Sequence, residues 1–125
     1  MSEYKFRGWD ATGQKGWVYG DLTHTKKVLK EEPFLADRVM IGGYEVVPES
    51  VGLWTGLKDK NGKEIFEGDW VLLEGVGVFN VRYSTFMCQF GLYGERGFVD
   101  ALKELQADRY EIIGNIIENQ ELLEQ

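Results

Sequence analysis

Residues 59–83 read DKNGKEIFEGDWVLLEGVGVFNVRY, and this stretch decides the fold class. Its Asn61-Gly62 dipeptide is the pair that best tolerates a tight turn with positive φ. A second turn follows at Glu67-Gly68-Asp69. Apolar residues then fill 70–73 and alternate with polar ones through 77–83, which predicts two paired strands. The stretch therefore predicts antiparallel β-structure.

More strands are expected on both sides of this stretch. Their signal is either a period of two or a short run of β-branched and aromatic residues. The predicted segments are a hairpin over 4–20, two short strands at 39–41 and 44–47, and further strands at 89–93 and 110–117. In contrast, residues 21–35 are polar and charged and end at Pro33, so an irregular excursion is expected there.

Two short helical segments are also expected. Phe98, Ala101, Leu102 and Leu105 recur at helical spacing, which predicts an amphipathic helix over 98–106. Asn119 is placed to cap a last helical turn through Leu122 and Leu123.

These elements predict a mainly β protein with one or two short helices. Several short strands with glycine turns favour a small barrel, and an SH3-like barrel of five strands suits residues 48–118. Pro48 lacks an amide donor and interrupts strand pairing. We therefore expect an N-terminal β-rich part at 1–47 and the barrel part at 48–125, although the composition does not change at this boundary.

The charge balance argues against direct contact with nucleic acid. The chain holds 14 Lys and Arg against 21 Asp and Glu, a formal charge of −7, and phosphates repel such a protein. The basic residues Lys26, Lys27 and Lys30 are followed at once by Glu31 and Glu32. A solvated face is the favoured interpretation of this cluster, and a nucleic-acid site is the alternative.

The apolar runs of the chain, its one cysteine and its one histidine bear on its location and chemistry. Apolar runs fall short of the ~18 residues of a membrane span and no signal-peptide segment is recognised, so a cytoplasmic protein is expected. Cys88 lies in an apolar stretch, which predicts a buried, inert thiol. His24 lies in a polar segment and is expected to be solvated. We expect no catalytic residues and no cofactor.

Three carboxylates near the Asn-Gly turn leave two interpretations open. Glu64, Glu67 and Asp69 have the oxygen ligands that a hard cation prefers. They are also compatible with a solvated rim of acidic side chains, which is the favoured interpretation.

Three segments resemble a known family. They are FRGWD at 6–10, VGLWTGLKDKNGKEIFEGD at 51–69 and YEIIGNIIEN at 110–119. Their order and spacing resemble the YopX-like family, small proteins encoded mostly by phages and prophages. The family usually has Ala where this chain has Gly8, a change we expect to be tolerated. The resemblance implies an N-terminal β-rich part and a C-terminal SH3-like barrel, but no activity and no catalytic residues.

The residues that carry this resemblance are expected to specify the fold. Thr55 and Asp59 are suited to accept hydrogen bonds from loop amides, and Gly114 inside a strand predicts a bulge or a close backbone approach. A binding site is the alternative interpretation. The full set is Phe6, Trp9, Asp10, Thr55, Gly56, Asp59, Asn61, Gly62, Glu67, Gly68, Asp69, Gly114 and Asn115.

The sequence therefore predicts a non-catalytic phage or prophage accessory protein that acts as a protein-binding or assembly module. The alternative is an acidic DNA mimic or regulator of a host nucleic-acid enzyme or repressor. The expected partners are further copies of the chain and a host or phage protein, with no nucleic acid and no membrane. Self-association is expected because open sheet edges and the aromatic hairpin over 4–20 need cover.

Overall fold

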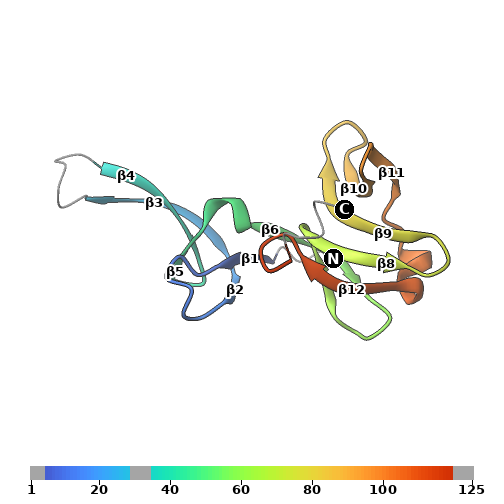
Figure 1. Ribbon diagram of the computed structural model, residues 1–125. Helices are drawn as coiled ribbons and strands as arrows, with labels where there is room; N and C mark the ends of the chain where they lie inside the picture. Colours follow the sequence, from blue (N-terminus) through green and yellow to red (C-terminus); the bar gives the residue numbers. More distant parts are fainter. Residues whose placement is uncertain (1–4, 29–34, 120–125) are drawn as a thin grey trace. The chain divides into compact units, whose positions relative to one another are not determined.

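The computed structural model describes residues 5–28 and 35–119, and antiparallel strands dominate it (Figure 1). The mainly β class is therefore confirmed. The chain divides into two compact units, which we call the N-terminal unit (described residues up to Leu53) and the C-terminal unit (described residues from Trp54). The division falls inside strand β6 (Gly52–Lys58).

The N-terminal unit holds two small sheets. The hairpin of β1 (Phe6–Trp9) and β2 (Trp17–Gly20) pairs with the start of β6, and the second sheet has the order β3-β4-β5. The core consists of Val18, Ile41 and Val46. The inner face of the hairpin is unusually close to that core, since a Cβ at Gly8 would lie 2.9 Å from atoms of Ile41 and Val46. Gly8 thus lets the two sheets approach.

The irregular excursion predicted for residues 21–35 is wrong for residues 22–28 and for residue 35, which lie in strands. Residues Leu22–Val28 form β3, which pairs with β4 (Leu35–Ile41) along its whole length, and β5 (Tyr44–Val46) follows. The two strands form a long ribbon that extends from the unit (Figure 1). Residues 29–34, including Pro33, lie outside the described residues.

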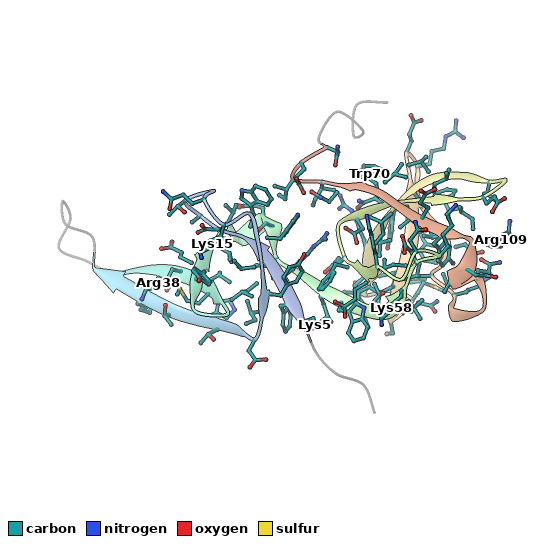
Figure 2. The ribbon with its side chains drawn as sticks, turned by 90° about the horizontal axis from the view of Figure 1, so that it is seen from below. Lys5, Lys15, Arg38, Lys58, Trp70 and Arg109 are labelled. Atoms are coloured by element: carbon teal, nitrogen blue, oxygen red, sulfur yellow. The ribbon has the colours of Figure 1, made fainter. Side chains whose placement is uncertain are left out.

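Polar contacts between neighbouring strands explain why this ribbon gives no apolar signal. Lys26 Nζ contacts Asp37 Oδ1 at 2.7 Å, and Arg38 Nε donates to Thr25 Oγ1 at 2.7 Å. Figure 2 shows Arg38 on this ribbon. Opposite-charge and threonine pairs across strands stabilise a sheet without burial. Lys26 is therefore part of a solvated strand rather than of a loop.

The C-terminal unit is built on an open sheet of five strands in the order β11-β10-β9-β8-β12. Its core consists of Ile65, Val71, Leu73, Val81, Leu92 and Tyr110. The elements after β6 are β7 (Glu64–Phe66), β8 (Asp69–Leu73), β9 (Gly77–Ser84), β10 (Gln89–Gly94), β11 (Gly97–Ala101), the 3₁₀ helix η2 (Glu104–Arg109) and β12 (Tyr110–Asn115). With β11 and β12 at its two edges, the sheet of the described residues is not a closed barrel.

The amphipathic helix predicted over 98–106 is wrong. Residues Gly97–Ala101 form β11, which returns along β10 from a turn with Gly97 at φ +106. The spacing of Phe98, Ala101 and Leu102 therefore spans the end of a strand, and short apolar segments of this kind fit both periods. Helical structure is limited, among the described residues, to η2 and to a 3₁₀ turn at Pro48–Ser50. The last helical turn predicted beyond Asn119 lies outside the described residues.

Some backbone amides at both edges of the five-stranded sheet donate hydrogen bonds to side chains. At β12, Ile112 N donates to Asp59 Oδ2 at 3.0 Å, and Asn115 N donates to Asn119 Oδ1 at 3.1 Å. At β11, Ala101 N donates to Asp100 Oδ1 at 2.8 Å, and the register with β10 shifts by a bulge. Such side-chain caps and bulges are how natural sheets blunt their edges.

Candidate functional site

The turn at residues 59–63 is organised by one carboxylate. Asp59 Oδ1 accepts from Asn61 N and Lys63 N at 2.9 Å each, while Oδ2 reaches Ile112 N in β12. Gly62 N donates to Asp59 O at 3.0 Å, and Gly62 has φ +82, so its predicted positive φ is confirmed. Asp59 is buried, and its carboxylate joins the turn to the last strand.

Strand β6 reaches this turn through a bulge. The register shifts between Trp54 and Lys58, and Gly56 at φ +88 lies in the shifted segment. Thr55 Oγ1 accepts from Leu57 N at 3.2 Å and donates to Ile65 O at 2.8 Å. The hydroxyl thus holds the irregular segment against β7.

The second turn, Glu67-Gly68-Asp69, uses its acidic side chains in the same way. Asp69 Oδ2 accepts from Phe66 N at 2.8 Å, and Glu67 Oε2 accepts from Tyr83 N at 3.1 Å. Gly68 has φ +98, and its carbonyl accepts from Asn80 Nδ2 at 3.1 Å. The positive φ agrees with the prediction that Gly68 is required by the turn. Within residues 5–28 and 35–119, no group of three or more His, Cys, Asp or Glu is arranged to hold a metal ion.

The N-terminal motif contains a comparable turn. Asp10 accepts from the Thr12 hydroxyl at 2.7 Å, from Lys15 N at 3.1 Å and from Thr12 N at 3.2 Å. Hydrogen bonding from the Thr12 hydroxyl, followed by that from the Lys15 amide, lowers the pKa of Asp10. The Lys15 ammonium lies 5.4 Å from the centroid of the Tyr44 ring, and Figure 2 labels Lys15 beside this loop.

Phe6 and Trp9 point to opposite faces of β1. Phe6 packs against the core of the N-terminal unit. Trp9 lies edge-on to Trp17 with ring centroids 5.3 Å apart, and its amide donates to Ser50 Oγ at 2.7 Å. The guanidinium of Arg7 lies 4.1 Å from the centroid of the Trp17 ring.

The last motif lies at the end of β12. The register shifts between Ile112 and Gly114, which confirms the predicted bulge. A Cβ at Gly114 would lie 2.7 Å from Asn119 Cγ, so the Asn119 side chain packs closely against the backbone of Gly114. Asn115 Oδ1 accepts from Ile117 N at 3.0 Å and Glu118 N at 2.8 Å. The motif residues of both units thus bind their own backbone and core.

Cys88 is exposed, so the prediction of a buried thiol is wrong. The apolar stretch around it is a hairpin loop between β9 and β10 rather than a continuous strand. Cys88 has φ +53, and its thiol donates to Thr85 O at 3.5 Å. His24 is exposed on β3, as expected.

Exposed apolar side chains are the feature that the motif analysis missed. Among the described residues, the large apolar side chains of this kind in the C-terminal unit are Leu72, Val76, Val78, Tyr83, Phe86, Met87, Phe98, Val99 and Ile113. The N-terminal unit contributes Tyr19 and Tyr44. The sequence signal was present in Phe86-Met87-Cys88, three residues without turn chemistry placed between two strands.

The comparison with protein families agrees with the motifs. The family model described as YopX protein matches residues 5–124. The chain belongs to the YopX family. The crystal structure of protein EF1440 from Enterococcus faecalis is similar to this YopX-family chain, with 28% sequence identity and a TM-score of 0.57. That similarity covers 98% of this chain and 99% of EF1440. The comparison of this chain with curated proteins found no match.

No helix of the described part of the chain is long and apolar enough to cross a membrane.

Proposed function

We propose that this YopX-family chain is a non-catalytic phage or prophage accessory protein that binds another protein in the bacterial cytoplasm. The observation that supports this proposal is the set of exposed apolar side chains on the C-terminal unit. Phe86 and Met87 are neighbours in this set, and adjacent exposed apolar side chains mark protein contacts more often than single ones do. Motif residues such as Thr55, Asp59 and Asn115, in contrast, form hydrogen bonds within the fold.

The proposal includes an SH3-like class for the C-terminal unit. Its support is the strand order β11-β10-β9-β8-β12, in which the last strand pairs with the first strand of the meander. The 3₁₀ helix η2 stands directly before that last strand. Small sheets of this class serve as supports for binding loops, although the fold alone carries no activity.

An acidic mimic or regulator is the second candidate, and the distribution of charge favours it. Residues 54–125 hold 7 of the 14 Lys and Arg but 13 of the 21 Asp and Glu, so they carry −6 of the formal charge of −7. An acidic surface of this kind suits a basic site on a host nucleic-acid enzyme or repressor. It also opposes direct DNA binding by this chain.

Purification of the tagged full-length chain from its bacterial cells, with and without prophage induction, tests both candidates. For a protein-binding module we expect one protein to be retained in near-stoichiometric amount when salt is raised to about 0.5 M, because apolar contacts are not screened. A DNA-binding enzyme or repressor that is released by the same salt step would support the mimic instead. Recovery of no protein would contradict both candidates.

Self-association is a separate part of the proposal. Its support is the aromatic face of the β1–β2 hairpin, which carries Trp9, Trp17 and the exposed Tyr19, since aromatic side chains are enriched at protein interfaces. A cyclic or dihedral assembly is the expected form. Light scattering coupled to size exclusion checks it: a 14.3 kDa species at every concentration up to about 100 μM would contradict it.

A further inference from the structure

The loop between β9 and β10 exposes apolar side chains at a hairpin tip. Ser84 and Gln89 are the last paired residues, and residues 85–88 form the loop. Phe86 is 92% exposed and Met87 is 45% exposed. Loop tips are normally built from Gly, Asn, Asp, Pro or Ser, which supply turn geometry and contact water favourably. A phenylalanine and a methionine side by side at this place do neither.

The loop is nevertheless held in a defined conformation. Ser84 is buried, and its Oγ accepts from Met87 N at 3.1 Å. Cys88 closes the loop at φ +53, the one non-glycine residue with positive φ in the described part of the chain. A left-handed conformation at a residue with a Cβ is unfavourable by roughly 1–2 kcal/mol relative to the right-handed one. The hydrogen bond to buried Ser84 thus anchors the turn that exposes Phe86 and Met87.

Apolar surface continues from the tip along the hairpin. Tyr83 is 43% exposed and lies edge-on to Phe90, with ring centroids 5.3 Å apart. Residues 83–93 contain no charged side chain. We call Tyr83, Phe86 and Met87 the apolar tip. A rigid aromatic and a flexible methionine at the end of a hairpin are the residue types that anchor protein interfaces.

We propose that the apolar tip inserts into an apolar pocket of a partner protein whose rim is basic. This inference rests on the proposed protein-binding function and names the element that carries it. The basic rim follows from charge, because the part of the chain that bears the tip, residues 54–125, has a net formal charge of −6. Electrostatic complementarity around an uncharged anchor speeds association and fixes its orientation.

A lipid surface fits the same tip less well. Loops and helices that bind anionic bilayers surround their apolar residues with Lys and Arg. Here, Glu67 binds the Tyr83 amide directly behind the tip, and Arg82 is the single cation of β9 and β10. Residues 54–125 have a net formal charge of −6, which anionic headgroups repel, so the observations favour a protein.

The test places a photoreactive benzophenone side chain at position 86 of the full-length chain in its bacterial cells. The matched control carries the same side chain at Val76, which is 60% exposed at the other end of β9. We expect an adduct with one protein from position 86 and none from position 76. The crosslinked peptide of that protein is expected to line an apolar pocket with Lys or Arg at its rim. An adduct with lipid, an adduct with a second copy of the chain, or no adduct would overturn the assignment.

Two serine variants separate this inference from the proposed function. Phe86→Ser is expected to weaken retention of the partner by at least about tenfold, while Val76→Ser leaves it unchanged. Both side chains are exposed, so both variants should keep the wild-type melting temperature. If the wild-type chain recovers a partner that Phe86→Ser binds equally well, the protein-binding function stands and the tip assignment fails. If the wild-type chain recovers no partner, the proposed function itself fails.

Vesicles provide the last arm of the test. The purified chain is floated with vesicles of phosphatidylglycerol and phosphatidylethanolamine, and we expect it to stay at the bottom of the gradient. Flotation of the wild-type chain that Phe86→Ser abolishes would replace the protein partner with a membrane.

Discussion

The two aspartate turns, residues 10–16 in the N-terminal unit and 59–63 in the C-terminal unit, begin alike and end differently. In both, the aspartate side chain accepts from the amide two residues later, and its carbonyl accepts from the glycine three residues later. Both side chains are nearly buried, at 5% exposed for Asp10 and 6% for Asp59. The partners of the Asp10 side chain lie within five residues, whereas the Asp59 side chain also binds the amide of Ile112, 53 residues away.

The difference teaches that one sequence signature can serve two purposes. The Asp10 side chain shapes its own loop, and only the backbone of that loop pairs with β5, through the Asp10–Val46 bridge. The turn at Asp59 shapes its loop and also supports the edge of β12. A loss at Asp59 should therefore spread through the C-terminal unit, while a loss at Asp10 should remain local.

Asp59→Ala should have the largest effect. The substitution removes three accepted hydrogen bonds and leaves the Ile112 amide without its partner, so we expect the free energy of unfolding to fall by roughly 3 kcal/mol. Urea unfolding followed by tryptophan fluorescence measures it. Lys63→Ala, on the exposed side of the same turn, is the control and should change the free energy by less than about 0.5 kcal/mol. Equal effects of the two variants would show that the link to β12 contributes nothing.

The two turn glycines should give an intermediate and equal effect. Gly13 at φ +78 and Gly62 at φ +82 have open space where a side chain would begin, with no heavy atom within 4 Å of an added Cβ. Gly13→Val and Gly62→Val should each lower the free energy of unfolding by about 1–2 kcal/mol, the cost of left-handed backbone. Thermal unfolding of the two variants checks this. A clear difference between them would mean that the turns are not equivalent even locally.

Asp10→Asn should have the smallest effect, and it should depend on pH. Folding lowers the pKa of Asp10, so the carboxylate stabilises the folded chain fully above its unfolded pKa of about 3.9. That contribution is lost as the pH falls through the lower folded pKa. The melting temperatures of wild type and variant should therefore differ slightly at pH 7 and converge toward pH 3. A difference that stays constant over this range would contradict the role assigned to the charge.

The sequence predicts the elements whose signal is local. Alternation around β8 and β9 indicates the central strands, and the Asn61-Gly62 pair indicates a turn that the backbone confirms. The ribbon of β3 and β4 escapes prediction because polar pairs such as Lys26 with Asp37 stabilise it instead of an apolar face. The helix expected over 98–106 fails for the opposite reason, since an apolar spacing of three and four fits a strand end as well as a helix.

The candidate site shows the same limit. That Asp59 accepts from loop amides follows from its place in a turn, but its bond to Ile112 needs the strand order, which no local pattern contains. The apolar stretch around Phe86 and Cys88 predicts burial although both residues are exposed, because hydrophobicity alone does not distinguish a core segment from an apolar loop. Apolar residues in the short segment between two predicted strands, where turn residues are usual, indicate such an exposed apolar loop.

The capped edges of the five-stranded sheet limit how this protein can grow into larger structures. Fibrils elongate by adding strands to free backbone groups, and here Asp59, Asp100 and Asn119 already occupy such groups on β11 and β12. Stacking of C-terminal units edge to edge is therefore obstructed at both ends of the sheet.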